Sequence, residues 1–268
     1  MILYQYRKID KYTIKTLLNN ELYFSFPSEF NDPFDCLGYT NCPKDKKSIE
    51  AFLNRMKNSD RMSEKQINEI KEMFEKVNYN SEIVKQYFPS ESNDIFRNKM
   101  IVKCFTSKND SILMWSHYAQ NHKGICLGLE VSQYSQDPSL YLLELDKINI
   151  YNGKPTKFLP IDKISYPVSD EIPEFNPFET VKQINYLTTK HKDWQYEQEY
   201  RCIMPYESLN TQYVNFKKEN LKEIIFGIES SSKDIENIKQ ILDTYYPNID
   251  CLKAKRVIGK YEIAFDNF

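Results

Sequence analysis

The sequence contains little glycine, with only 6 such residues in 268. Glycine-rich loops that hold phosphates with backbone N–H groups are therefore excluded, and neither a dinucleotide-binding nor a Walker-type fingerprint is present. Histidine is also scarce, with 3 residues, and the 6 cysteines lack the close spacing of a zinc site. We therefore expect neither a bound metal nor one of the common nucleotide-binding loops.

The chain also lacks a strong charge bias and long apolar runs. Its 36 Lys plus Arg against 38 Asp plus Glu give a formal net charge of -2, which offers no electrostatic basis for a dedicated nucleic-acid binder. No apolar stretch approaches the roughly 20 residues of a membrane-spanning helix, and the N-terminus is too polar for a signal sequence. The sequence predicts a cytoplasmic protein with reduced cysteines and no membrane partner.

Hydrophobic residues make up 41% of the chain, which is enough for one elaborated domain over residues 1–268. Strand patterns outnumber helical ones and do not alternate with them regularly, so the predicted fold class is α+β. Residues 44–99 differ, because they are lysine-rich and helical in period, with a capping box at Ser63–Gln66 before an apolar stripe. We expect a helical insertion over residues 44–99, outside the central sheet.

The most informative stretch runs from Trp194 to Arg201, where aromatic and charged residues alternate. A helix over about 178–192 is expected to precede it. As a strand of period two, the stretch would place Glu197, Glu199 and Arg201 on one face. Two carboxylates beside a guanidinium suit a site that handles a cationic centre and a diphosphate. The alternative is an exposed face on which the arginine only neutralises its acidic neighbours.

A second polar segment, from Phe30 to Asp35, is a turn built from Asn, Asp and Pro between two aromatic residues. Its simplest interpretation is a structural corner. Asn31 and Asp35 would equally line a pocket if the two rings are buried.

Seven stretches share a pattern of aromatic and polar landmarks in a fixed order: Leu3–Arg7, Leu22–Ser25, Phe30–Asp35, Cys104–Ser107, Met114–Ala119, His122–Gly128 and Trp194–Arg201. Together they resemble a bacterial family known only as domain-of-unknown-function family 2971. The resemblance spans most of the chain except the helical insertion. The family name carries no activity.

A second resemblance does carry an activity. Arg7 on the first strand, Thr106 and Ser107 at the end of a middle strand, and a Glu-x-Glu element at Glu197–Glu199 follow the order found in toxin-like ADP-ribosyltransferases. This resemblance implies a core of two packed sheets with a helical insertion. It also implies NAD as substrate, with ADP-ribose transfer or NAD cleavage in phage defence or as a toxin. The departures are an incomplete Ser-Thr-Ser element and long inserted helices.

The resemblance also implies residue roles. Glu199 would stabilise the positive charge that develops on the nicotinamide ribose, and Glu197 would orient an unspecified acceptor. Arg7 would bind the diphosphate, and Tyr118 would stack on the nicotinamide. Thr106 or Ser107 would brace Glu199 or the ribose. The remaining candidates, which would line the NAD pocket, are Asn31, Asp35 and Arg201.

Two other hypotheses remain open. The chain could be a non-enzymatic module of a defence system that binds a partner or single-stranded nucleic acid through its 20 Tyr and 16 Phe residues. It could also be a metal-dependent hydrolase that uses Asp32, Asp35, Glu197 and Glu199. Release of nicotinamide from NAD, measured with and without EDTA, separates the three hypotheses.

Overall fold

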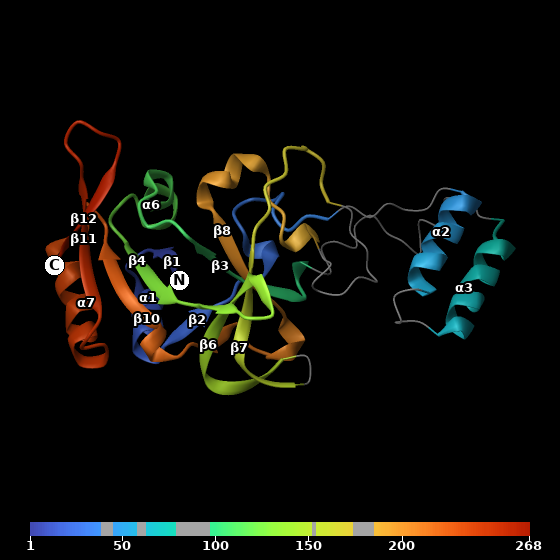
Figure 1. Ribbon diagram of the computed structural model, residues 1–268, viewed down its shortest axis with the longest axis horizontal. Helices are drawn as coiled ribbons and strands as arrows, with labels where there is room; N and C mark the ends of the chain where they lie inside the picture. The colour runs from blue at the N-terminus through green and yellow to red at the C-terminus, as the bar shows by residue number, and fades with distance from the viewer. Residues whose placement is uncertain (39–44, 58–62, 79–96, 152–153, 174–184) are drawn as a thin grey trace.

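The computed structural model describes residues 1–38, 45–57, 63–78, 97–151, 154–173 and 185–268. Within these ranges helices and strands are mixed without regular alternation, which confirms the α+β class (Figure 1). One large and one small antiparallel-rich sheet organise the described chain. Every described helix is too short or too polar to span a bilayer.

The strands of the large sheet, in spatial order, are β12 (Ile263–Asn267), β11 (Asp250–Arg256), β10 (Leu221–Phe226), β4 (Ile125–Glu130), β1 (Ile2–Arg7), β3 (Met100–Thr106), β8 (Glu199–Pro205), β7 (Lys154–Lys163), β6 (Asp137–Tyr151) and β5 (Ser132–Tyr134). The small sheet pairs β2 (Glu21–Tyr23) with β9 (Tyr213–Asn215). Among the strands that the structure describes, β10 and β11 are the only parallel neighbours, and the helix between them makes the crossover that such a pair requires.

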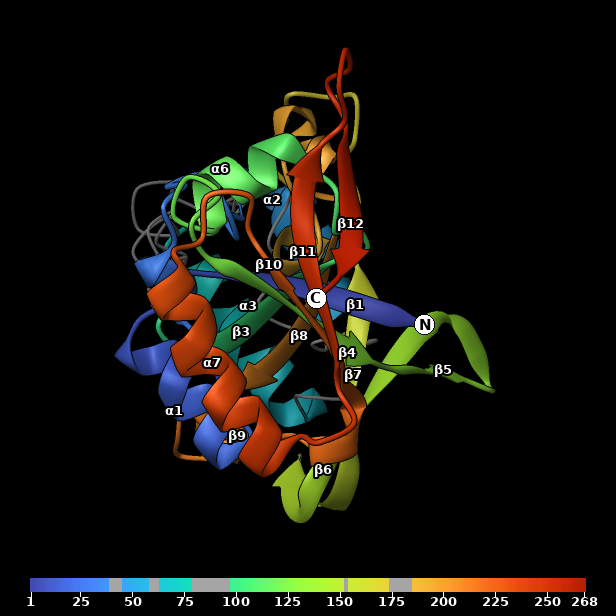
Figure 2. The same cartoon turned by 90° about the vertical axis from the view of Figure 1, so that its left-hand side faces the viewer.

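The helices of the described chain are α1 (Lys11–Asn19), α2 (Lys46–Lys57), α3 (Glu64–Lys76), α6 (Ile112–Tyr118) and α7 (Ser232–Tyr245), with short 3-10 turns η1 (Pro27–Glu29), η3 (Asn185–Leu187), η4 (Lys192–Glu197), η5 (Tyr206–Ser208) and η6 (Lys218–Asn220). Figure 2 shows α1 and α7 side by side on one face of the sheet. Because both helices are amphipathic, each buries one apolar stripe there.

The main core lies between these two helices and the sheet. Leu17 of α1 and Ile238 of α7 are fully buried and belong to the same apolar cluster as Leu3 of β1. On the opposite face, α6 buries Trp115 completely, and its ring meets Tyr6 of β1 edge-on at 5.1 Å between centroids. The strand β1 is therefore covered on both faces, which fixes its position in the molecule.

A single backbone pair joins the two halves of the large sheet. β1 pairs with β4 along its whole length and β3 pairs with β8 along its whole length, but β1 and β3 face each other only at Tyr4 and Thr106. Further along the same edge of β3, Val102 bridges to Ser25 instead. An opening therefore lies between the two strands, bounded by these two contacts, and we call it the β1–β3 gap.

The helices α2 and α3 fall within the predicted insertion at residues 44–99 and lie to one side of the sheet in Figure 1. They share a separate small core formed by Ile49, Phe52, Leu53, Ile67 and Phe74. The expected capping box is present, since Ser63 and Gln66 bond reciprocally. Residues 58–62 and 79–96 lie outside the described residues, so the insertion boundaries and the single domain stay predictions.

Two expected elements are wrong. The stretch from Trp194 to Arg201 is not one strand, because it begins inside the 3-10 helix η4 and enters β8 only at Glu199. Between the two elements, Gln198 adopts a left-handed conformation with φ of 43°. Of the expected helix over about 178–192, residues 178–184 lie outside the described residues, and the only helical structure in residues 185–192 is the 3-10 turn Asn185–Leu187 and the first residue of η4. The alternation of residue types does not reveal the turn at Gln198, because that turn is held by contacts with the distant strand β3.

Candidate functional site

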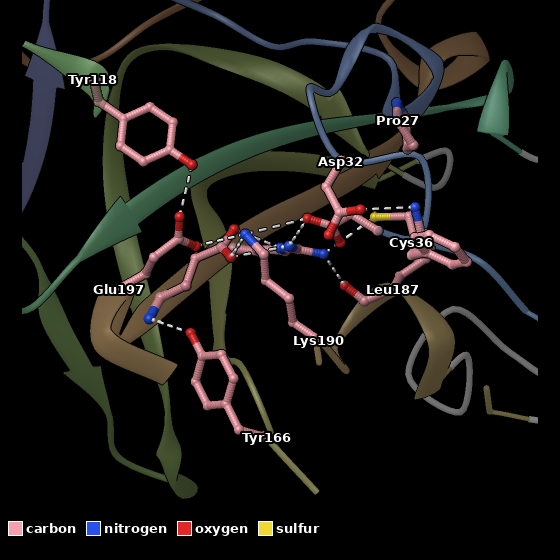
Figure 3. A network of polar contacts seen from close by, with 12 residues as sticks. Pro27, Asp32, Cys36, Tyr118, Tyr166, Leu187, Lys190 and Glu197 are labelled. Carbon is pink, nitrogen blue, oxygen red and sulfur yellow. Dashed lines mark hydrogen bonds and ion pairs between the residues drawn. The ribbon is translucent and has the colours of Figure 1, made fainter. Parts of the chain in front are cut away.

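Five charged side chains, each less than a tenth exposed, meet at the start of β8, and we call them the carboxylate cluster. Its members are Asp35, Lys190, Glu197, Glu199 and Arg201 (Figure 3). They come from the Phe30–Asp35 corner, the segment before η4, the end of η4, and β8. The sequence predicted four of them and missed the lysine.

Arg201 is the most deeply buried member of the cluster and has no exposed surface. Its Nε donates to Glu199 Oε1 at 2.6 Å, and its Nη2 donates to Glu199 Oε2 at 2.9 Å and Asp35 Oδ2 at 2.7 Å. Its Nη1 donates to Cys36 Sγ and to the Leu187 carbonyl, both at 3.1 Å. All five guanidinium donors are thus used inside the protein. None is left to bind the diphosphate of a ligand, which was the expected role of this arginine.

Lys190 joins the three carboxylates. Its Nζ lies 2.5 Å from Glu197 Oε2, 3.1 Å from Glu199 Oε2 and 3.3 Å from Asp35 Oδ2, and 4.8 Å from the centre of the Trp194 ring. Burial opposes the charged ammonium, but the three carboxylates outweigh it and raise the pKa of Lys190. No sequence pattern marks this lysine, because its partners lie on separate segments.

The pKa values of the two glutamates are displaced in opposite directions. Burial raises the pKa of Glu197, and the charge of Lys190 offsets only part of this effect. Burial acts in the same direction on Glu199, but Arg201 and Lys190 outweigh it and lower the pKa of Glu199 to about 2. Neighbouring carboxyls whose pKa values move apart are the pattern of an acid–base group beside a permanently ionised one.

Three further residues form hydrogen bonds with the glutamates, and Figure 3 shows the bonds of two of them, Tyr118 and Tyr166. The Tyr118 hydroxyl of α6 donates to Glu197 Oε1 at 2.7 Å. Thr106 donates its hydroxyl to the Glu197 carbonyl, and the Glu199 N–H donates to the Tyr166 hydroxyl at 2.9 Å. Thr106 therefore braces the turn before β8, whereas the expected brace was to the Glu199 side chain or the ribose.

A cleft of about 480 Å³ opens over the carboxylate cluster. The predicted residues that line it are Asn31, Asp35, Thr106, Tyr118, Glu197 and Glu199. Arg7 lines an adjoining cavity of about 580 Å³. Seven residues line both cavities: Gln5, Tyr6, Lys8, Tyr23, Ser25, Lys103 and Tyr118. Ser107 lies outside both linings and donates to Gln198 Oε1. The structure thus brings six predicted residues into one cleft and places Arg7 next to it.

The adjoining cavity is cationic. Its charged lining consists of Arg7, Lys8, Lys15 and Lys103 against one acidic residue, Asp10. That aspartate is already used, because it accepts from two backbone N–H groups at the start of α1. The combined cleft therefore has an acidic end at the cluster and a basic end at the β1–β3 gap.

The described residues contain no group of His, Cys, Asp and Glu arranged to hold a metal ion. The position between Asp35, Glu197 and Glu199 is filled by the Lys190 ammonium. Asp32 is not part of the cluster, since its side chain accepts from the Phe34 N–H within the turn. Asp32, Asp35, Glu197 and Glu199 therefore do not form one ligand set in the described part of the chain.

Comparison with known proteins gives one match. Residues 114–202 match the model of a family described as "Protein of unknown function (DUF2971)". The matched region contains four members of the carboxylate cluster and ends inside β8. It confirms the resemblance to family 2971 over these residues, while the resemblance to ADP-ribosyltransferases stays a prediction. No curated protein and no solved structure matches the chain.

Proposed function

We propose that the chain is an NAD-dependent enzyme that breaks the nicotinamide–ribose bond, either as an ADP-ribosyltransferase or as an NAD glycohydrolase. The observation that carries this proposal is the pair Glu197 and Glu199, which share one cleft and have pKa values displaced in opposite directions. A cationic cavity continues from that cleft. A ligand with a cationic ring at one end and a diphosphate further along matches this distribution of charge.

The chemistry follows from the opposite displacement of the two pKa values. Cleavage of the C1′–N bond passes through an oxocarbenium-like state, and the electron pair leaves with the nicotinamide nitrogen, which becomes neutral. Glu199 stays ionised and supplies negative charge close to the developing cation. Glu197 takes the proton of the attacking water or acceptor hydroxyl as the new C1′–O bond forms, because its raised pKa favours the protonated product.

The sheet arrangement is also consistent with this proposal. The β1–β3 gap divides the strands into two halves that meet at one backbone pair, as in a core made of two sheets with a cleft between them. Arg7 borders the gap, where it would bind the diphosphate of NAD. A place in phage defence or as a toxin is part of the proposal, and the acceptor is left open.

The test is incubation of the purified protein with NAD, with chromatographic detection of free nicotinamide in the presence and absence of EDTA. We expect EDTA-insensitive release. Glu197→Gln should lose transfer to an acceptor while it keeps some cleavage by water, with a loss on the order of 100-fold in the acid–base step. Glu199→Gln should lose both activities. Glu207→Gln, at an exposed position outside the cleft, is the matched control.

The outcomes separate the hypotheses. Absence of nicotinamide release with every acceptor tested would leave the non-enzymatic binding module as the better description. Wild-type NAD consumption by both cleft variants would show that the carboxylate cluster is only structural. Hydrolysis that requires Mg²⁺ or Mn²⁺ would restore the metal-hydrolase hypothesis.

A further inference from the structure

The β1–β3 gap contains a buried lysine that has no partner. Lys103 is 6% exposed, yet its side chain forms no hydrogen bond or ion pair with any residue that the structure describes. It lines both cavities. A buried amine without an acceptor is costly for folding, so its presence in the core of a sheet points to a ligand rather than to stability.

Two neighbours of Lys103 share this lack of partners. Arg7 uses Nε and Nη1 to bond the hydroxyls of Thr13 and Thr16 at 3.0 and 2.8 Å, which orients its guanidinium, while Nη2 has no acceptor among the described residues. Gln5 Oε1 is buried and lacks a donor. The orientation of an amide is assigned from its bonds, so Gln5 can equally present its NH₂ group to the gap.

The geometry of the strands brings these groups together. By strand alternation, Gln5, Arg7 and Lys103 point to the face that α1 covers, the face on which Leu3 and Phe105 belong to the core. In the described strand pairs, residues 103–105 have no neighbour on this edge of β3. Hydrogen-bond donors without acceptors, from two strands, therefore lie together in the gap. The cavity next to them is lined by charged residues that are mostly cationic.

We infer that the β1–β3 gap is a binding site for a phosphate or diphosphate group, with Lys103 and Arg7 as its cationic ligands. An anion here satisfies the buried ammonium and the free Nη2 at once, and an arginine fork beside a lysine suits tetrahedral oxyanions. Burial and the charge of Arg7 lower the pKa of Lys103 well below its usual value, and an anion opposes both effects. The inference rests on the proposed function only in the choice of a diphosphate ester as probe.

The experiment is calorimetric titration of the full chain with inorganic pyrophosphate, ADP and adenosine. Pyrophosphate and ADP should bind and adenosine should not. Lys103→Met should weaken pyrophosphate and ADP at least about tenfold, as expected for loss of a charge-assisted hydrogen bond. Lys163→Met, which removes an exposed lysine of β7, should leave both affinities unchanged. Equal effects of the two lysine variants would overturn the inference.

A stability measurement tests whether weaker binding by Lys103→Met results only from damage to the fold. Lys103→Met replaces an unpartnered buried amine by an apolar chain of similar length, so its melting temperature should equal or exceed that of the wild type. Lower stability together with weaker binding would show a structural role and overturn the inference. Tighter binding of a single-stranded oligonucleotide than of ADP would also overturn it, because the gap is lined for one compact anion.

The inference and the proposed function fail in different ways. If pyrophosphate binds in a Lys103-dependent way but no nicotinamide is released, the anion site is supported and the proposed enzymatic activity is contradicted. If the wild type and Lys103→Met cleave NAD with the same KM, the proposed enzymatic activity is supported and the anion site is contradicted.

Discussion

The carboxylate cluster and the β1–β3 gap are both buried and charged, but they use their charges in opposite ways. In the cluster, three carboxylates surround two cations, and Arg201 bonds through all five donors. In the gap, Arg7 and Lys103 have no carboxylate partner among the described residues. The two cations of the cluster are held in place by carboxylates of the protein, whereas the two cations of the gap have donors left for a ligand.

The difference also separates stability from function. Removing one member of a paired buried network leaves its partners charged and unpaired, which is strongly destabilising. Removing an unpaired buried polar group removes an unfavourable contribution to the free energy of folding. Substitutions in the two regions should therefore change the free energy of unfolding with opposite signs, and the following predictions test that contrast.

The largest effect is expected for Arg201→Met. The change leaves Glu199 and Asp35 buried with only Lys190 as counter-charge, so the free energy of unfolding should fall by about 3–5 kcal/mol. Urea denaturation followed by circular dichroism measures it. Arg256→Met is the matched control, because that arginine pairs with Glu229 on the surface, where an ion pair contributes roughly 0–1 kcal/mol. Similar losses in the two variants would remove the distinction between the regions.

The next effect is a dependence of stability on pH. Because the pKa of Glu199 is lowered to about 2 in the folded chain, its contribution is present above its ordinary pKa of 4.5 and is lost as pH falls towards 2. The stability difference between wild type and Glu199→Gln should therefore shrink by on the order of 3 kcal/mol between pH 6 and pH 2. Glu197 acts in the opposite direction, since its pKa is raised.

Urea titrations at several pH values give this difference directly. The surface variant Glu207→Gln should follow the wild-type profile at every pH. A wild-type minus Glu199→Gln difference that stays constant with pH would mean that the carboxylate is not held ionised by its neighbours.

A smaller effect is expected for Tyr118→Phe, which removes the hydrogen bond to Glu197 Oε1 and keeps the ring. Stability should fall by about 1.5–3 kcal/mol, the range for a hydrogen bond to a charged group. The pKa of Glu197 should rise further, because this bond favours the ionised form. Tyr12→Phe, at an exposed position, is the control. A carboxyl titration followed by NMR that shows no shift would contradict the prediction.

The smallest effect, with the opposite sign, is expected for Gln5→Met. Gln5 Oε1 is buried without a donor, so the variant should unfold with unchanged free energy or gain up to about 1 kcal/mol. Gln240→Met, on the exposed face of α7, should change stability by less than about 0.5 kcal/mol. A clear loss in Gln5→Met alone would show that the glutamine has a partner inside the protein.

Sequence reasoning succeeded where local pattern and tertiary structure agree. The strand of Ile2–Arg7, the apolar stripe of α7 and the capping box at Ser63 all follow from residue periodicity or from short-range bonds. It failed at the turn before β8, where Gln198 takes a left-handed conformation that glycine or asparagine usually supplies. That turn is held by Thr106, a residue 91 positions away from Glu197.

The candidate site shows the same limit. Glu197 and Glu199 could be singled out because two carboxylates two residues apart are visible in a single sequence. Lys190 could not, since its three partners are brought together only by folding. Lys103 did leave a signal, as the one charged residue in the apolar strand Met100–Thr106. A lone charge in a buried strand is a feature that sequence reading can use.

The same two cations also account for the shape of the sheet. The antiparallel pair Tyr4–Thr106 sets the register. If β1 and β3 continued to pair beyond it, Arg7 would lie directly opposite Lys103. Like charges in facing positions repel, and a charged residue that points inward is a known guard against unwanted pairing at a strand edge. Repulsion between Arg7 and a charged Lys103 would oppose pairing of the strands across the β1–β3 gap, and a bound anion would screen it. An anion that binds there would draw the two halves of the sheet towards each other.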